Sequence, residues 1–178
     1  MKVMIIAPYI YDDNMIEFTK NKTGFGIMVQ NIVSSVAKLE NVVLLTRVIT
    51  KGKNEKNFKI LSHTWRQFFS NAKLKDWLIG IKAFFANGVT VKDKARHVFY
   101  EVDGGYVRKQ IQKEKPDIVH IHGIGTITES YIRICEEMKV RYTVTLHGLI
   151  GLNDSVSAPA YEKQIERDFL IKAEKNNI

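Results

Sequence analysis

The chain has 178 residues, of which 45% are hydrophobic and 26% are charged; this composition is typical of a folded domain with a sizeable core and excludes disorder along the whole chain. No apolar run approaches the roughly 20 residues that cross a bilayer, and Pro8 ends the first apolar run too early for a secretory signal. The single cysteine, Cys135, excludes a disulfide framework, so we expect a cytoplasmic protein. The net charge of +8 suits a nucleic acid, an anionic membrane surface or a phosphorylated substrate, and does not choose among them.

The first part of the chain is predicted to alternate between strand and helix. Residues 3–7 form a short, continuous apolar run, which is typical of a strand buried on both faces. Apolar side chains at helical spacing predict a helix over residues 27–39, and β-branched residues predict a second strand over residues 42–49. A polar loop is expected over residues 51–57.

Both tryptophans lie in residues 65–86, where the apolar spacing predicts a helix in two pieces with lysine and arginine on its polar side. A basic helix with an aromatic stripe can lie on a membrane or hold a lipid-linked acceptor. A helix hairpin that covers the core explains the same pattern, and we favour this second interpretation. Further on, Gly104 and Gly105 are expected to mark a turn or the start of a charged helix that Pro116 stops.

The rest of the chain repeats strand, loop and helix. The expected elements are a strand over residues 117–122, a helix over 127–138, a strand over 142–146 and a helix over 160–175. This alternation predicts an α/β fold, a doubly wound and mostly parallel sheet with helices on both faces, formed by residues 1–178 as a single Rossmann-like domain. The sequence stops where the pattern would next supply a strand, so we expect the chain to be part of a longer protein.

A glycine segment is the first feature expected at the ligand-binding edge, beyond the carboxyl ends of the strands. The loop Thr23-Gly24-Phe25-Gly26 precedes the first predicted helix. Its glycines would let the backbone approach a phosphate, and a helix N-terminus offers free amides. The spacing does not match the dinucleotide fingerprint, because Val29 stands where the third glycine would be. A loop whose glycines serve only its turn geometry explains the pattern equally well.

Three histidines are the second feature at this edge. His120 and His122 share one face of their predicted strand, because side chains two apart in a strand point the same way. His122 and His147 are each followed by glycine where a strand opens into a loop. Two strands with the same ending favour a functional site over structural histidines. We expect His122 to be the main functional side chain and His120, one step deeper, to be a packing or supporting residue.

Taken in order, these motifs resemble the N-terminal domain of the retaining family 4 glycosyltransferases of the GT-B fold. The strongest resemblance lies in residues 115–123, Lys-Pro-Asp-Ile-Val-His-Ile-His-Gly, followed by residues 144–148, Val-Thr-Leu-His-Gly. The glycine loop at residues 23–26 and the helix after it also resemble the family's, with Thr23 in place of the usual first glycine. Residues 49–102 match no part of the family pattern.

This resemblance implies metal-independent transfer of a hexose-type sugar, with retention of configuration, from a nucleotide sugar to a glycan or lipid-linked acceptor in polysaccharide or glycoconjugate biosynthesis. His122 would be the catalytic residue, facing the transferred sugar or the acceptor. The implied substrate-binding residues are Gly24, Phe25, Gly26, His120, His147 and Gly148. No cofactor or metal is implied, and the donor nucleotide would belong to a separate C-terminal domain, so this chain alone is expected to be inactive. Peripheral contact with a membrane is a further expectation.

Two alternatives stay open. A His-x-His pair at the end of a strand can ligate zinc, so His120 and His122 would also suit a zinc-dependent hydrolase, with His147 as the one plausible further ligand. The basic charge balance would also suit a non-enzymatic nucleic-acid-binding module. The aromatic residues, however, lie at core-like helical spacing rather than in a surface stacking pattern.

Overall fold

The computed structural model describes residues 1–8, 10, 24–46, 54–55, 58–62, 65–86, 90–152, 158 and 160–176. The strands of these residues form one sheet; they are β1 (Lys2–Ala7), β2 (Asn41–Thr46), β3 (Asn54–Glu55), β4 (Phe58–Ser62), β5 (Ile118–His122) and β6 (Tyr142–Thr145). The helices are α1 (Gly24–Ala37), α2 (Trp65–Asn71), α3 (Leu74–Ala86), α4 (Val91–Glu114), α5 (Thr126–Met138) and α6 (Ala160–Asn176), with a short 3-10 helix, η1 (Ile150–Leu152).

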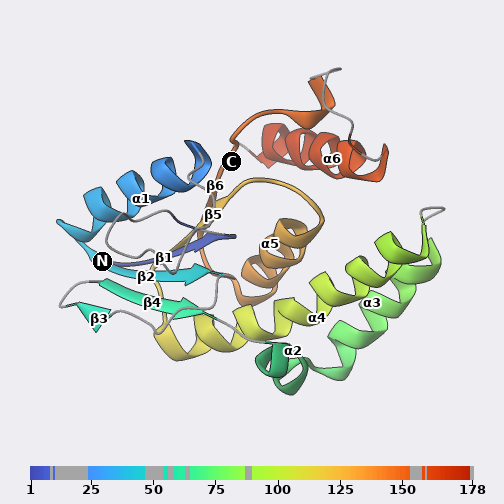
Figure 1. Ribbon diagram of the computed structural model, residues 1–178, viewed down its shortest axis with the longest axis horizontal. Coiled ribbons are helices and arrows are strands. Elements are labelled where there is room, and N and C mark those ends of the chain that lie inside the picture. Colours follow the sequence, from blue (N-terminus) through green and yellow to red (C-terminus); the bar gives the residue numbers. More distant parts are fainter. Residues whose placement is uncertain are drawn as a thin grey trace.

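The sheet has the strand order β3-β4-β2-β1-β5-β6 and is parallel except for the antiparallel edge strand β3. In Figure 1 the arrows of β1, β2 and β4 accordingly point the same way. The chain builds to one side of β1 through β2 and β4, and then to the other side through β5 and β6. This reversal creates a switch point between β1 and β5, where doubly wound sheets bind their ligands. The predicted α/β fold with a mostly parallel sheet is confirmed.

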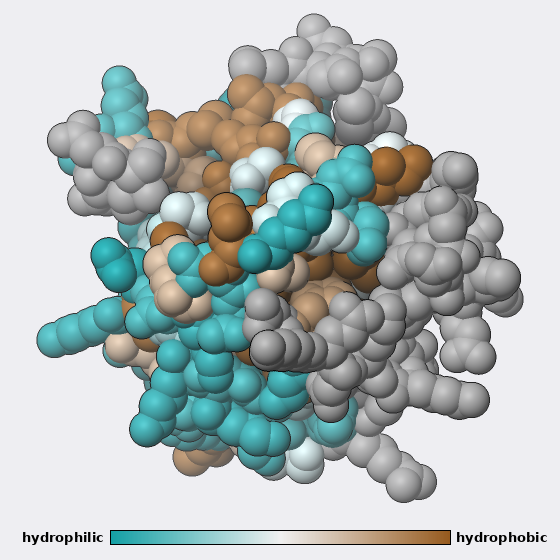
Figure 2. Space-filling view, turned by 90° about the vertical axis from the view of Figure 1, so that its left-hand side faces the viewer, coloured by the Kyte–Doolittle hydropathy of each residue, from teal (hydrophilic) through white to brown (hydrophobic). Residues whose placement is uncertain are grey.

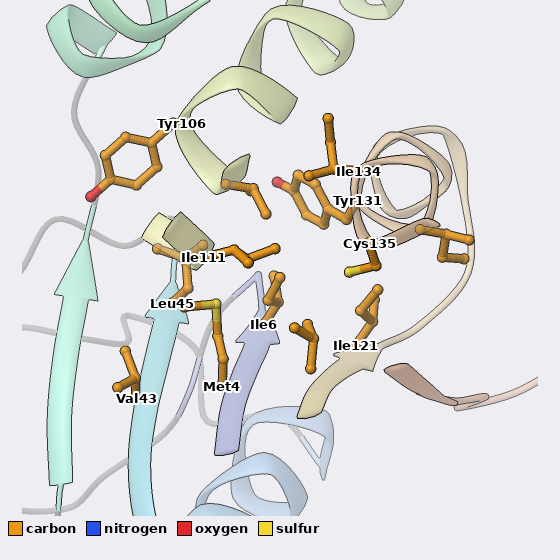
Figure 3. Packing of buried hydrophobic residues seen from close by; sticks show 13 residues of the cluster. Met4, Ile6, Val43, Leu45, Tyr106, Ile111, Ile121, Tyr131, Ile134 and Cys135 are labelled. Carbon is orange, nitrogen blue, oxygen red and sulfur yellow. The ribbon is translucent and has the colours of Figure 1, made fainter. Parts of the chain in front are cut away.

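Helices cover both faces of the sheet, because the side chains of each buried strand alternate between two apolar clusters. Ile5 of β1 packs with Val29 of α1 in one cluster. Its neighbour Ile6 packs with Tyr131 of α5 and with residues of α4 in the other cluster, which Figure 3 shows in detail. Cys135 belongs to this second cluster, and burial raises the pKa of its thiol to about 12, so the thiol is not a nucleophile at neutral pH.

The long helix α4 corrects the prediction that Gly104 and Gly105 mark a turn or a helix start. Both glycines lie inside a continuous 24-residue helix. A Cβ atom on Gly105 would lie 2.7 Å from the carbonyl oxygen of Asn71 and 2.8 Å from the Cα of Ala72. The glycine is therefore needed where the end of α2 presses against the middle of α4, and the packing between these helices outweighs the low helix propensity of glycine.

Further differences from the prediction lie at one edge of the sheet. The second strand ends at Thr46 among the described residues, β3 falls within the expected polar loop, and β4 was not predicted at all. The two helical pieces over residues 65–86 are confirmed as α2 and α3. Figure 2 views the molecule from the left-hand side of Figure 1, where hydrophilic side chains cover the lower part and hydrophobic ones gather near the top. Within the described ranges, none of the helices combines the length and apolarity needed to cross a bilayer.

Candidate functional site

A cavity of about 520 Å³ opens at the carboxyl ends of β1 and β5, at the switch point of the sheet. This volume is within the range of pockets that bind small molecules. Apolar side chains, among them Ile6, Leu45 and Ile127, form most of its wall. The polar features are His122 at the end of β5, His147 after β6, and the glycine turn between β5 and α5. The cavity is therefore an apolar pocket with a few polar groups at one end.

His122 and His147 form a hydrogen-bonded pair at this polar end. The parallel register of β5 and β6 places His122 opposite Thr145, so the chain that continues beyond β6 brings His147 back over His122. The Nδ1 atom of His122 lies 3.0 Å from the Nε2 atom of His147, and the two rings are stacked with an angle of 11° between their planes. Phe25 of α1 contacts the His147 ring edge-on, with 4.6 Å between the ring centroids.

Burial decides the charge of this pair. His122 is 1% exposed; this burial, together with the neighbouring His120 and His147 rings, lowers the pKa of His122 to about 4. The pKa of His147 is lowered as well, by burial. His122 is therefore neutral at neutral pH. Its other ring nitrogen, Nε2, is buried and has no hydrogen-bond partner among the described residues.

The neutral pair can present either hydrogen-bonding role at Nε2 of His122. If His122 donates its Nδ1 proton to His147, its own Nε2 is a bare acceptor; if His147 donates to His122, the Nε2 of His122 carries a proton and is a donor. The two arrangements are neutral tautomers of the pair, so Nε2 of His122 can accept or donate without adding charge to the pocket. Passing from the first to the second moves the shared proton to His147, removes the proton from Nδ1 of His147 and places one on Nε2 of His122. Such a group suits hydroxyl ligands, which donate and accept.

His120 has a different environment from His122. Its Nε2 atom lies 2.6 Å from the hydroxyl oxygen of Thr145 on the neighbouring strand, and its ring lies next to that of His122, with 4.4 Å between the centroids. Burial and the nearby His147 lower the pKa of His120. His120 is not among the residues that line the cavity, so in this structure it contacts the pair from behind.

The turn between β5 and α5 is the glycine-rich segment that faces the cavity. Gly123 has a φ of 85°, in the region that favours glycine, and Gly123 and Gly125 both line the cavity. Gly125 is the N-cap of α5 and supplies no side-chain cap. The hydroxyl of Thr126 in the first turn is buried and lacks a partner among the described residues. Free amides at a helix N-terminus attract an anion. The sequence feature that indicates this anion site is the segment Gly123 to Thr126, which directly follows a strand.

The first glycine segment is placed differently from its prediction. Thr23 lies outside the described residues, and Gly24 and Gly26 belong to the first turn of α1 instead of a loop before it. Phe25 lines the cavity, as do His147 and Gly148, whereas Gly24 and Gly26 do not. The structure thus brings Phe25, His122, His147 and Gly148 together around one space.

Glu166 of α6 supports the wall of the cavity and was missed by the sequence analysis. It is 2% exposed, and its carboxylate accepts hydrogen bonds from the backbone amides of Ile150 and Gly151, each at 2.8 Å. Ile150 lines the cavity together with Gly148 and Leu149. A glutamate in a charged helix carries no sequence signal for this role, because the amides that it binds are formed by another segment.

The zinc alternative can be compared with this geometry. Within the part of the chain that the structure describes, no group of three or more histidine, cysteine, aspartate or glutamate side chains is arranged to hold a metal ion. Among His120, His122 and His147, the Nε2 atom of His120 is hydrogen-bonded to Thr145, and the Nδ1 atom of His122 is hydrogen-bonded to His147. These ring nitrogens are therefore already engaged within the protein.

The comparisons with known proteins add little to this geometry. No family model and no curated protein matches the chain. A solved structure from E. coli, described as trehalose-6-phosphate bound with UDP-2-fluoro glucose, is similar to the chain with a TM-score of 0.46 and 9% sequence identity. The match covers 97% of this chain and 43% of that one, so the present chain spans less than half of its length.

Proposed function

We propose that this chain is the acceptor-side half of a nucleotide-sugar-dependent glycosyltransferase, and that its cavity holds the sugar being transferred. One observation carries the proposal: the buried His122, paired with the exposed His147, has an unsatisfied nitrogen, Nε2, at the switch point of a doubly wound sheet. Buried polar atoms in a folded protein nearly always have partners. A ligand hydroxyl would supply the missing partner once the cavity wall, which covers this nitrogen in the structure, shifts to admit it.

The walls of the cavity fit the other parts of a hexose. A sugar ring presents C–H groups as well as hydroxyls, and the apolar lining around Phe25 and Tyr131 offers matching contact surface. The uncapped start of α5, at Gly125, lies on the same cavity and suits the negative charge of a phosphate. A sugar that carries a phosphate at one end would therefore use both polar features of the site.

The finer activity follows the family resemblance. Transfer would retain the configuration of a hexose and use no metal; the acceptor would be a glycan or lipid-linked molecule of polysaccharide or glycoconjugate biosynthesis, and the cell compartment would be the cytoplasm. His122 would face the sugar, with His147 orienting its ring and His120 supporting it from behind. The donor nucleotide would be held by a second domain, so the 178 residues alone would bind sugar without transferring it.

Isothermal titration of the chain with glucose 1-phosphate, mannose 1-phosphate, the free hexoses and inorganic phosphate tests this proposal. A hexose 1-phosphate should bind more tightly than the free hexose or phosphate alone, because it reaches both polar features. His122→Ala should weaken this binding at least tenfold, and the surface variant Leu39→Ser should leave it unchanged. The sugar site is refuted if no hexose 1-phosphate binds, or if His122→Ala binds as the unaltered chain does. Turnover of a nucleotide sugar by these 178 residues alone would contradict the proposal that a second domain holds the donor nucleotide.

A further inference from the structure

The outward face of helix α3 carries a continuous apolar stripe. Leu74, Leu78, Ile81 and Phe85 recur at helical spacing and are 75%, 58%, 48% and 76% exposed, respectively. We call these four residues the α3 stripe. Single exposed apolar side chains are common in proteins, but a contiguous set on one helix face marks an interaction surface.

The opposite face of α3 already makes the contacts that hold the helix to the protein. Asp76 is fully buried, and its carboxylate accepts two hydrogen bonds of 2.8 Å from the guanidinium of Arg108 in α4. A Cβ on Gly80 would lie 3.1 Å from the Cα of Val98, so the backbones of the two helices approach closely there. In Figure 1, α3 packs against α4 on the side of the molecule away from β3 and the N-terminus. The α3 stripe therefore faces outward because the other face is fixed by α4.

The surroundings of the α3 stripe are positively charged. Lys73 directly precedes Leu74, the first residue of the stripe, and Lys82 directly follows Ile81 in α3. Lys92 follows the exposed Val91 at the start of α4. None of the ion pairs among the described residues includes these three lysines. The nearby acidic groups are already engaged, since Asp76 pairs with Arg108 and Asp93 with Arg96.

We propose that the α3 stripe docks this protein on the surface of an anionic membrane. Apolar side chains with lysines beside them fit an interface of acyl chains and negatively charged headgroups, into which such a helix sinks without crossing. A second copy of the chain fits less well, because a symmetric contact would bring the same lysines of both copies together. A nucleic acid would use the lysines but leave the apolar side chains exposed. The inference does not depend on the proposed sugar site.

Co-sedimentation with vesicles tests the docking directly. The chain should bind vesicles of phosphatidylcholine that contain phosphatidylglycerol, and bind vesicles of pure phosphatidylcholine far more weakly. The double variant Leu78→Ser/Phe85→Ser should lose binding by tenfold or more. The double variant Lys73→Ala/Lys82→Ala should lose about fivefold for each lysine, the equivalent of about 1 kcal/mol per charge at an anionic surface. Leu39→Ser removes a side chain that is 85% exposed in the turn after α1 and should bind as the unaltered chain does.

Circular dichroism shows whether each variant is folded. Each variant should also have the same affinity for hexose 1-phosphate as the unaltered chain. Three results would overturn the docking. They are absence of binding to the anionic vesicles, an equal loss for Leu39→Ser and the α3 double variant, and self-association in sedimentation equilibrium that the Leu78→Ser/Phe85→Ser change abolishes. In the last case, the occupant of the face is a second copy of the chain.

Discussion

His122 and His147 are 25 residues apart in the chain, yet Nδ1 of the first lies 3.0 Å from Nε2 of the second. His122 is the last residue of β5 and His147 follows β6, and the parallel pairing of these strands brings them together. The pair is neutral at neutral pH because burial and the neighbouring histidines lower the pKa of His122 to about 4, and burial lowers that of His147. The polar end of the cavity can therefore exchange hydrogen-bonding roles without carrying charge.

The buried His122 should make stability depend on pH in acid. An imidazole in the unfolded chain has a pKa of about 6.5, whereas that of His122 in the folded chain is about 4, so protonation favours the unfolded state. The contribution is complete above about pH 6.5, decreases as the pH falls toward 4, and decreases no further below that, with a total of roughly 3 kcal/mol. Urea unfolding between neutral pH and pH 4 should show this loss. His122→Asn should remove much of it; equal pH dependence in the two chains would contradict the assigned pKa.

Glu166→Gln should loosen the cavity wall. The substitution removes the charge from two hydrogen bonds to backbone amides and leaves one amide facing a side-chain NH₂ group, so a destabilisation of about 1 to 3 kcal/mol is expected. Hydrogen exchange should quicken at the amides of Ile150 and Gly151, which Glu166 binds. Glu174→Gln, on the exposed side of the same helix, is the matched control. Unchanged exchange at both amides in Glu166→Gln would show that the carboxylate does not hold this wall.

The two adjacent glycines of α4 should respond in opposite directions to alanine. A Cβ on Gly105 meets backbone atoms at 2.7 and 2.8 Å, whereas the nearest atom to a Cβ on Gly104 is a side-chain carbon of Ile134 at 3.5 Å. Gly105→Ala should therefore lower the free energy of unfolding by about 1 to 3 kcal/mol through overpacking. Gly104→Ala should be neutral or stabilise by up to about 1 kcal/mol, because alanine is the better helix former. Equal effects in thermal or urea unfolding would contradict the close contact between α2 and α4.

The sequence predicted those features that depend on local pattern. The continuous apolar run of β1 and the alternation of strand and helix along the chain indicate the parallel sheet, and the two-residue period of a strand places His120 and His122 on one face. The pairing of His122 with His147 depends on strand register, which no local pattern encodes. Helix α4 was not predicted from the sequence as one uninterrupted helix. Gly105 is required by its close contact with the backbone of Asn71 and Ala72, which lie far away in the sequence. Glu166 was missed for the same kind of reason, since its partners are amides formed elsewhere.

The proposed sugar-binding cavity has the histidine pair at its polar end, and the decisive measurement is imidazole NMR during a titration with glucose 1-phosphate or mannose 1-phosphate. His97 is an internal control, because its Nε2 is also buried without a partner among the described residues but lies outside the cavity. A sugar bound against the pair should cause saturable shifts of the ring resonances of His122 and His147, with those of His97 unchanged. Saturable binding that leaves His122 unshifted, or that shifts all three histidines alike, would contradict the proposed site.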